Sequence, residues 1–149
     1  MNESSAGTGH SLSIKREYGY PPSRVFEAWT NPEMIAVWMM PKPETKVLAT
    51  VDLAIGGAYR LVFDNGDGDP FVVNGQYREI DPPQKLSFTW SWEGGIREPA
   101  ETLVTVELAP TSSGTELTLT HECLSSGESV ELHSTGWNGC LNGLQQYLD

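Results

Sequence analysis

Cysteine and basic residues are both scarce in this sequence, and each shortage excludes a class of protein. The two cysteines, Cys123 and Cys140, are too few for a disulfide framework. The 9 Lys and Arg residues are outnumbered by 20 Asp and Glu, for a formal net charge of −11, and they form no basic stripe along the chain. The sequence therefore disfavours binding to nucleic acid, and for the same reason attraction to an anionic membrane surface.

Long hydrophobic runs are absent as well, since no apolar stretch reaches the roughly 18 residues that a membrane-spanning helix needs. The first nine residues are small and polar and lack both the basic and the apolar region of a signal peptide. We therefore expect no membrane insertion and a cytoplasmic location. No repeat, low-complexity tract or linker divides the 149 residues, so we expect a flexible tail at 1–10 and a single domain at 11–149.

Alternation of apolar and polar residues predicts seven strands. The first strand is expected near residues 11–17, where Leu12, Ile14 and Arg16 share one face. Six more are expected at residues 45–54, 57–64, 70–80, 85–93, 100–109 and 115–122. The turns between these six are short and rich in Gly, Asp and Pro, which implies an antiparallel meander.

Helical spacing occurs in three places. Two short helices are expected after the first strand, one opening at Pro22 or Ser23 and one capped by Asn31, with Pro32 at its first position. Near the C-terminus an apolar stripe recurs at intervals of four, three and four residues, at Trp137, Leu141, Leu144 and Leu148. Glycines at positions 136, 139 and 143 weaken this helix in isolation and are expected to let it approach a sheet closely.

These elements predict an α+β fold in which a curved antiparallel sheet wraps around the long C-terminal helix. The order resembles the helix-grip fold of the START-like, birch-pollen-allergen-like (SRPBCC) superfamily. Within it the chain is similar to the AHSA-type domains, named after the activator of heat-shock-protein-90 ATPase. The resemblance covers about residues 11–148, and the stretches that carry it are 14–16, 21–29, 38–41, 56–59, 75–90, 114–121, 136–137 and the leucines at 141, 144 and 148.

The resemblance implies a hydrophobic cavity that holds a lipid, a polyketide or a similar molecule. It also leaves open a chaperone partner and a part in the stress response, through an interaction module on the outer surface. Family members often carry two aromatic residues and a glycine before the proline that ends the second helix. Here Met39 and Met40 follow Trp38, which changes the wall or mouth of any pocket.

An aromatic cluster is the main candidate for ligand binding. The residues expected to face inward and line a cavity are Trp38, Met39, Tyr59, Trp90, Trp92, His121, Trp137 and Leu141. Aromatic walls with a few polar groups suit an apolar ligand. The alternative is that these rings simply fill the core.

Arg16 and His121 are the candidate catalytic residues, since each continues the inward phase of its strand. In a polyketide-cyclase-like enzyme His121 would act as general base and Arg16 would stabilise an enolate. The alternative is an internal ion pair for Arg16 and a hydrogen-bonded core imidazole for His121. We lean towards a binding protein rather than an enzyme.

The sequence contains no convincing motif for a metal ion or a cofactor. Two histidines and two cysteines, His121, Cys123, His133 and Cys140, could in principle hold zinc, but their spacing matches no standard module. The acidic loop at residues 64–69 does not fit a calcium loop, because proline stands where glycine is needed. We expect no metal and no cofactor. A homodimer stays open.

Overall fold

In the computed structural model, residues 9–95 and 97–149 are described. The elements follow the expected order and are β1 (His10–Tyr18), α2 (Pro22–Thr30), α3 (Pro32–Trp38), β2 (Lys46–Val51), β3 (Ala58–Asp64), β4 (Phe71–Asp81), β5 (Lys85–Trp92), the 3-10 turn η1 (Glu93–Gly95), β6 (Thr102–Thr111), β7 (Gly114–Leu124) and α4 (Gly127–Leu148). Of the expected tail at residues 1–10, positions 1–8 lie outside the described residues. His10 already belongs to β1.

The strands form one antiparallel sheet in the order β1-β7-β6-β5-β4-β3-β2. From β2 to β7 each strand pairs with the next one along the chain, as the short turns predict. β1 pairs with β7 and forms the edge strand on that side, where Ile14 lies opposite Leu119. The sheet is therefore curved and unclosed, with β1 and β2 at its edges.

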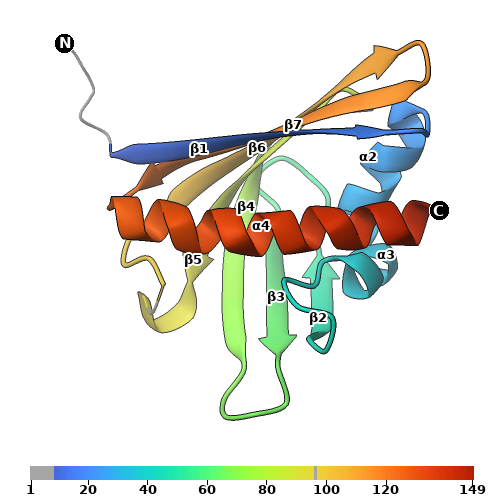
Figure 1. Cartoon of the computed structure of the whole chain (residues 1–149). Coiled ribbons are helices and arrows are strands. Elements are labelled where there is room, and N and C mark those ends of the chain that lie inside the picture. Colours follow the sequence, from blue (N-terminus) through green and yellow to red (C-terminus); the bar gives the residue numbers. More distant parts are fainter. Residues whose placement is uncertain (1–8, 96) are drawn as a thin grey trace.

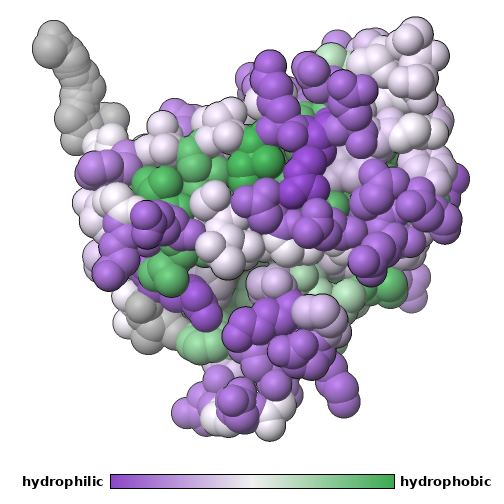
Figure 2. Space-filling view, in the orientation of Figure 1, coloured by the Kyte–Doolittle hydropathy of each residue, from purple (hydrophilic) through white to green (hydrophobic). Residues whose placement is uncertain are grey.

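The long helix α4 lies across one face of this sheet, and α2 and α3 stand beside its C-terminal end (Figure 1). The expected inward residues of β7, Leu117, Leu119 and His121, are all fully buried. The apolar stripe of α4 is buried too, with Trp137, Leu141, Leu144 and Leu148 in the core. This arrangement confirms the α+β helix-grip prediction. On the face drawn in Figure 2, hydrophilic residues surround the β3–β4 turn, and hydrophobic residues gather towards the N-terminal half of α4.

The two glycines in the C-terminal half of α4 mark its closest packing. A Cβ at Gly139 would lie 2.3 Å from the carbonyl oxygen of Pro41, and one at Gly143 would lie 2.5 Å from that of Trp38. The glycines therefore allow close approach to the backbone that ends α3. The expectation that all three allow approach to the sheet is wrong, and Gly136 has no atom within 4 Å of an added Cβ.

Polar side chains from β1 hold the same part of the helix. Both terminal nitrogens of the Arg16 guanidinium donate to α4, at 2.7 Å to Asn138 Oδ1 and 2.8 Å to Asn142 Oδ1. The hydroxyl of Tyr18 donates to the carbonyl oxygen of Leu141 at 3.0 Å. The C-terminal half of α4 is thus fixed to β1 on one side and to the end of α3 on the other.

Two glycines of α4, Gly136 and Gly143, are expected to respond in opposite ways to substitution by alanine. Gly136→Ala is expected to raise the free energy of unfolding by about 0.5–1 kcal/mol, because alanine favours the helix and meets nothing. Gly143→Ala is expected to lower it by roughly 1–3 kcal/mol, because its methyl group would overlap the Trp38 carbonyl. Urea unfolding of both variants measures this. Equal effects at the two positions would contradict the packing of α4.

Candidate functional site

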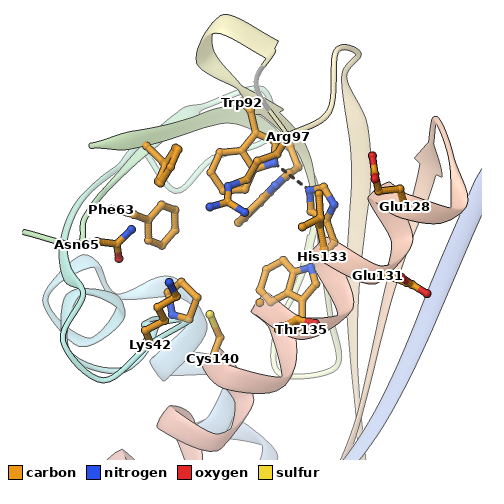
Figure 3. Close-up of a pocket in the computed structure, with 16 residues that line it drawn as sticks. Lys42, Phe63, Asn65, Trp92, Arg97, Glu128, Glu131, His133, Thr135 and Cys140 are labelled. Atoms are coloured by element: carbon orange, nitrogen blue, oxygen red, sulfur yellow. Dashed lines mark hydrogen bonds between the residues drawn. The ribbon is translucent and has the colours of Figure 1, made fainter. Parts of the chain in front are cut away.

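A cavity of about 530 Å³ lies between the N-terminal two thirds of α4 and the strands β3, β4 and β5 (Figure 3). We call it the aromatic cavity. Its lining comes from the segment after α3, the β3–β4 hairpin, the end of β5, residue 97 and one side of α4. The lining residues are Pro41, Lys42, Phe63, Asn65, Phe71, Trp90, Trp92, Arg97, Glu128, Glu131, Leu132, His133, Thr135, Gly136, Trp137 and Cys140.

Five aromatic side chains make up the apolar wall. Trp92 stands between two of them, with its ring centroid 6.1 Å from that of Phe63 and 6.5 Å from that of Phe71. Trp90 lies 5.8 Å from Trp92 and 4.9 Å from Trp137. The strands β3 to β5 and the helix α4 therefore contribute rings to one continuous wall. Offset and edge-to-face packing of this kind holds large side chains in place while leaving space between them.

A chain of hydrogen bonds fixes His133 in the wall of the cavity. Trp92 Nε1 donates to His133 Nε2 at 2.9 Å, and His133 Nδ1 donates to the Ser129 carbonyl oxygen at 2.8 Å. Nε2 accepts, so the ring is neutral and carries its proton on Nδ1. Burial, together with the charge of Arg97, lowers the pKa of His133 and keeps this form, although the backbone contact and Glu98 act in the opposite direction.

Behind His133 lies a buried carboxylate, Glu98, only 1% exposed. Its Oε1 accepts from the Ser129 hydroxyl at 2.8 Å and from both the backbone nitrogen and the hydroxyl of Ser125, and the backbone nitrogen of Ala100 donates to Oε2. Burial disfavours the charged form, but these hydrogen bonds outweigh it and hold the pKa of Glu98 below its ordinary value. Glu98 thus ties the N-terminal turn of α4 to the segment before β6.

His121 makes a second indole–imidazole pair, deeper in the protein. Trp137 Nε1 donates to His121 Nδ1 at 3.0 Å, and His121 Nε2 donates to the Thr102 hydroxyl at 2.7 Å. Burial, with a smaller effect from His133, lowers the pKa of His121 to about 3. The two imidazole rings lie 4.8 Å apart edge to face and carry their protons on opposite nitrogens.

The structure divides the eight residues expected to bind a ligand. Trp90, Trp92 and Trp137 line the aromatic cavity. Met39 and Tyr59 do not line it; together with Trp90 they border a void of about 20 Å³, and Tyr59 also borders a more open space of about 710 Å³ formed by β2 to β5. The remaining three, Trp38, Leu141 and His121, are buried in the core and line none of these spaces.

The two candidate catalytic residues do not meet. Arg16 shares the inward face of β1, but its guanidinium binds the two asparagines of α4 and does not line the cavity. His121 is fully buried, and both of its ring nitrogens are already hydrogen-bonded. A catalytic role for either residue stays a prediction.

The four possible zinc ligands lie in different environments. Cys123 is exposed, whereas Cys140 is buried in the cavity wall, where burial raises the pKa of its thiol well above the ordinary value. In residues 9–95 and 97–149, no group of three or more His, Cys, Asp or Glu side chains could hold a metal ion. No helix in this part of the chain is long and apolar enough to cross a membrane.

Most of the lining residues were not predicted from the sequence to bind a ligand, and the most informative of these are Phe63, Phe71, Arg97 and His133. Phe63 and Phe71 lie opposite each other across the β3–β4 hairpin, and pairing the two strands about the turn at residues 65–69 could have found them. His133 lies one turn before Trp137 on the same face of α4, so helical spacing could have found it. Arg97 follows the glycines of η1, where no periodicity marks a face.

Comparison with known proteins places these features in a family. The family model described as Activator of Hsp90 ATPase homolog 1-like protein matches residues 19–149. No curated protein sequence matches the chain.

Three solved structures illustrate the likeness of the fold. A protein from Chromobacterium violaceum has a TM-score of 0.81 and 26% identity, over 91% of this chain and 94% of its own. The AHSA1 protein from Silicibacter pomeroyi has a TM-score of 0.80 and 28% identity, over 93% and 97%. A protein from Nitrosomonas europaea has a TM-score of 0.75 and 27% identity, over 93% of each chain.

The two neutral histidines predict a loss of stability in mild acid. An unfolded histidine takes up a proton near pH 6.5, whereas folded His121 does so only near pH 3. Between these values the unfolded state binds more protons, so the free energy of unfolding falls as pH falls, by up to about 1.4 kcal/mol per pH unit for His121, and His133 acts in the same direction. Urea unfolding between pH 7 and pH 5, above the range of ordinary carboxylates, measures this.

Two variants show which histidine causes the dependence of stability on pH. His121→Gln is expected to flatten the dependence of stability on pH, whereas His10→Gln, at an exposed position, should leave it unchanged. A stability that does not change between pH 7 and pH 5 in the unmodified protein would contradict the buried neutral imidazoles.

Proposed function

The chain belongs to the family described as Activator of Hsp90 ATPase homolog 1-like protein, and on this premise we propose that it binds an aromatic, largely apolar small molecule in the aromatic cavity. The observation that carries the proposal is the space of about 530 Å³ behind a wall of five aromatic rings. Ligand pockets of roughly 300–1,000 Å³ are usual for small molecules, and they combine apolar walls with a few polar groups.

The size of the cavity favours a ligand over a simple core. Protein interiors pack to nearly the density of organic crystals, and voids larger than a water molecule are few. The void near Met39 and Tyr59, of about 20 Å³, is of that ordinary kind. The aromatic cavity is more than twenty times larger. Leu132, which also lines it, is 44% exposed, so the cavity is within reach of the surface.

Two other functions follow from the sequence, and no feature of the structure favours either. A cyclase-like enzyme would need His121 and Arg16 at the substrate, and neither lines the cavity. A chaperone-linked module would use the outer surface, where the family description supplies a partner by analogy alone. Binding of a small molecule, in contrast, would use the aromatic cavity itself.

Native mass spectrometry of the freshly purified protein is the first experiment. We expect a mass above that of the chain, and organic extraction should release one apolar aromatic species in a stoichiometric amount. Where the protein carries no molecule, the neutral fluorescent probe N-phenyl-1-naphthylamine takes the place of the natural ligand, and it should bind with a large rise in fluorescence.

Filling the cavity is expected to abolish that binding. Gly136→Phe places a ring at the cavity wall from a position where an added Cβ meets nothing, so the helix remains intact. Gly127→Phe is the matched control, because Gly127 is equally unobstructed on α4 but does not line the cavity. Titration of N-phenyl-1-naphthylamine with each variant measures the effect. Unchanged binding by Gly136→Phe would overturn the proposal.

A further inference from the structure

The polar groups of the aromatic cavity narrow the class of ligand. We propose that the ligand is an aromatic anion, whose rings pack on the aromatic wall and whose negative group pairs with Arg97. The proposal rests on the proposed function, since it needs a ligand in the cavity. It adds the sign of the ligand's charge and names Arg97 as the residue that binds the charged group.

Hydrogen-bond donors stand without acceptors around this cavity. Arg97 Nε is buried and has no hydrogen-bond partner among residues 9–95 and 97–149. The same holds for the indole Nε1 of Trp90, which lines both the cavity and the void of about 20 Å³, and for that of Trp29, which lines only the void. A buried donor without an acceptor is costly, and more so when it is charged. The charged donor, Arg97, is therefore the one that most needs an acceptor-bearing ligand.

The Arg97 guanidinium is held in place by two aromatic rings. Its Cζ lies 4.4 Å from the ring centroid of Phe71 and 5.2 Å from that of Trp92. A guanidinium stacked on rings keeps the N–H donors of its own plane available, and their fork matches a carboxylate, sulfonate or phosphate. The rings therefore position the cation before any ligand arrives.

Arg97 has no ion-pair partner among the described residues. The ion pairs formed within the described part of the chain use Arg60, Arg78 and Lys85, and none uses Arg97. Glu128 and Glu131 line the cavity rim, but their carboxylates point away from its centre in Figure 3.

A second cation strengthens the same conclusion. Lys42 lies across the cavity from Arg97 in Figure 3, so two of the 9 basic residues of this acidic chain line one space. His133, in the same wall, is held neutral. An aromatic cage without basic residues would suit a cationic ligand, but here Arg97 and Lys42 would repel one.

A matched pair of probes tests the charge. 1-Anilinonaphthalene-8-sulfonate and N-phenyl-1-naphthylamine share one ring system and differ by the sulfonate. We expect the unmodified protein to bind the sulfonate at least tenfold more tightly, although its net charge of −11 repels anions in general. Arg97→Met should weaken binding of the sulfonate about tenfold or more and leave binding of the neutral probe within about twofold.

Controls separate charge, site and folding. Arg78→Met removes the same charge from an exposed position that does not line the cavity, and it should change neither affinity. Arg97→Lys keeps the charge without the fork, so the sulfonate should bind with intermediate affinity. Should Arg97→Met fail to fold, Arg97→Lys and the ratio of the two affinities in the unmodified protein still decide the question. Gly136→Phe should abolish binding of both probes.

The outcomes of the two proposals are distinct. If both probes bind in the cavity with equal affinity, and Arg97→Met changes neither, the assignment of charge is wrong and the proposed function stands. If neither probe responds to Gly136→Phe, no aromatic ligand occupies the cavity and both proposals fall. Preference for the sulfonate that is lost in Arg97→Met supports both.

Discussion

The position of α4 depends on its contact with the backbone at the end of α3, and the rest of the structure depends on that position. At Gly139 and Gly143 the helix approaches the carbonyls of Pro41 and Trp38 more closely than any side chain would allow. A helix is a stiff rod, so its seating at one end sets its distance from the sheet at the other. Nearer its N-terminus, the face of α4 that is turned to the sheet carries the larger side chains of His133 and Trp137. The aromatic cavity lies in the space that these larger side chains hold open.

Two indole N–H groups of this aromatic interior are paired with histidines. Each of the two donates to an imidazole, Trp92 to His133 and Trp137 to His121, which links the sheet to α4 and uses the lone pair of each ring. An imidazole whose lone pair is taken and whose pKa is lowered is a poor general base at neutral pH. The same pairing that stabilises the core therefore favours binding over acid–base catalysis at this site.

Local periodicity was enough to predict the fold. Alternation located the strands and the buried face of β7, and the four-three-four spacing located the buried stripe of α4. The site required tertiary facts. Arg16 has the predicted inward phase, but its partners are asparagines of α4, more than a hundred residues away in the chain. Aromatic residues that fill a core and those that line a cavity have the same pattern. Tyr59 and Trp90 share this alternating pattern, yet only Trp90 also borders the space beside α4.

Charge and apolar area must act together in this cavity if its ligand is an anion. The chain carries a net charge of −11, and this field repels anions at long range and gives no electrostatic steering. Within the roughly 8 Å over which physiological salt screens charges, a ligand in the cavity would meet Arg97 and Lys42, while the carboxylates of Glu128 and Glu131 point away from the centre. A small hydrophilic anion would meet the repulsion and gain little from the rings. A neutral aromatic without an acceptor would leave the donors of Arg97 and Trp90 unpaired, and one with a neutral acceptor would leave the charge of Arg97 without a counterion. A molecule with both an aromatic body and a negative group suits the wall and the cation at once.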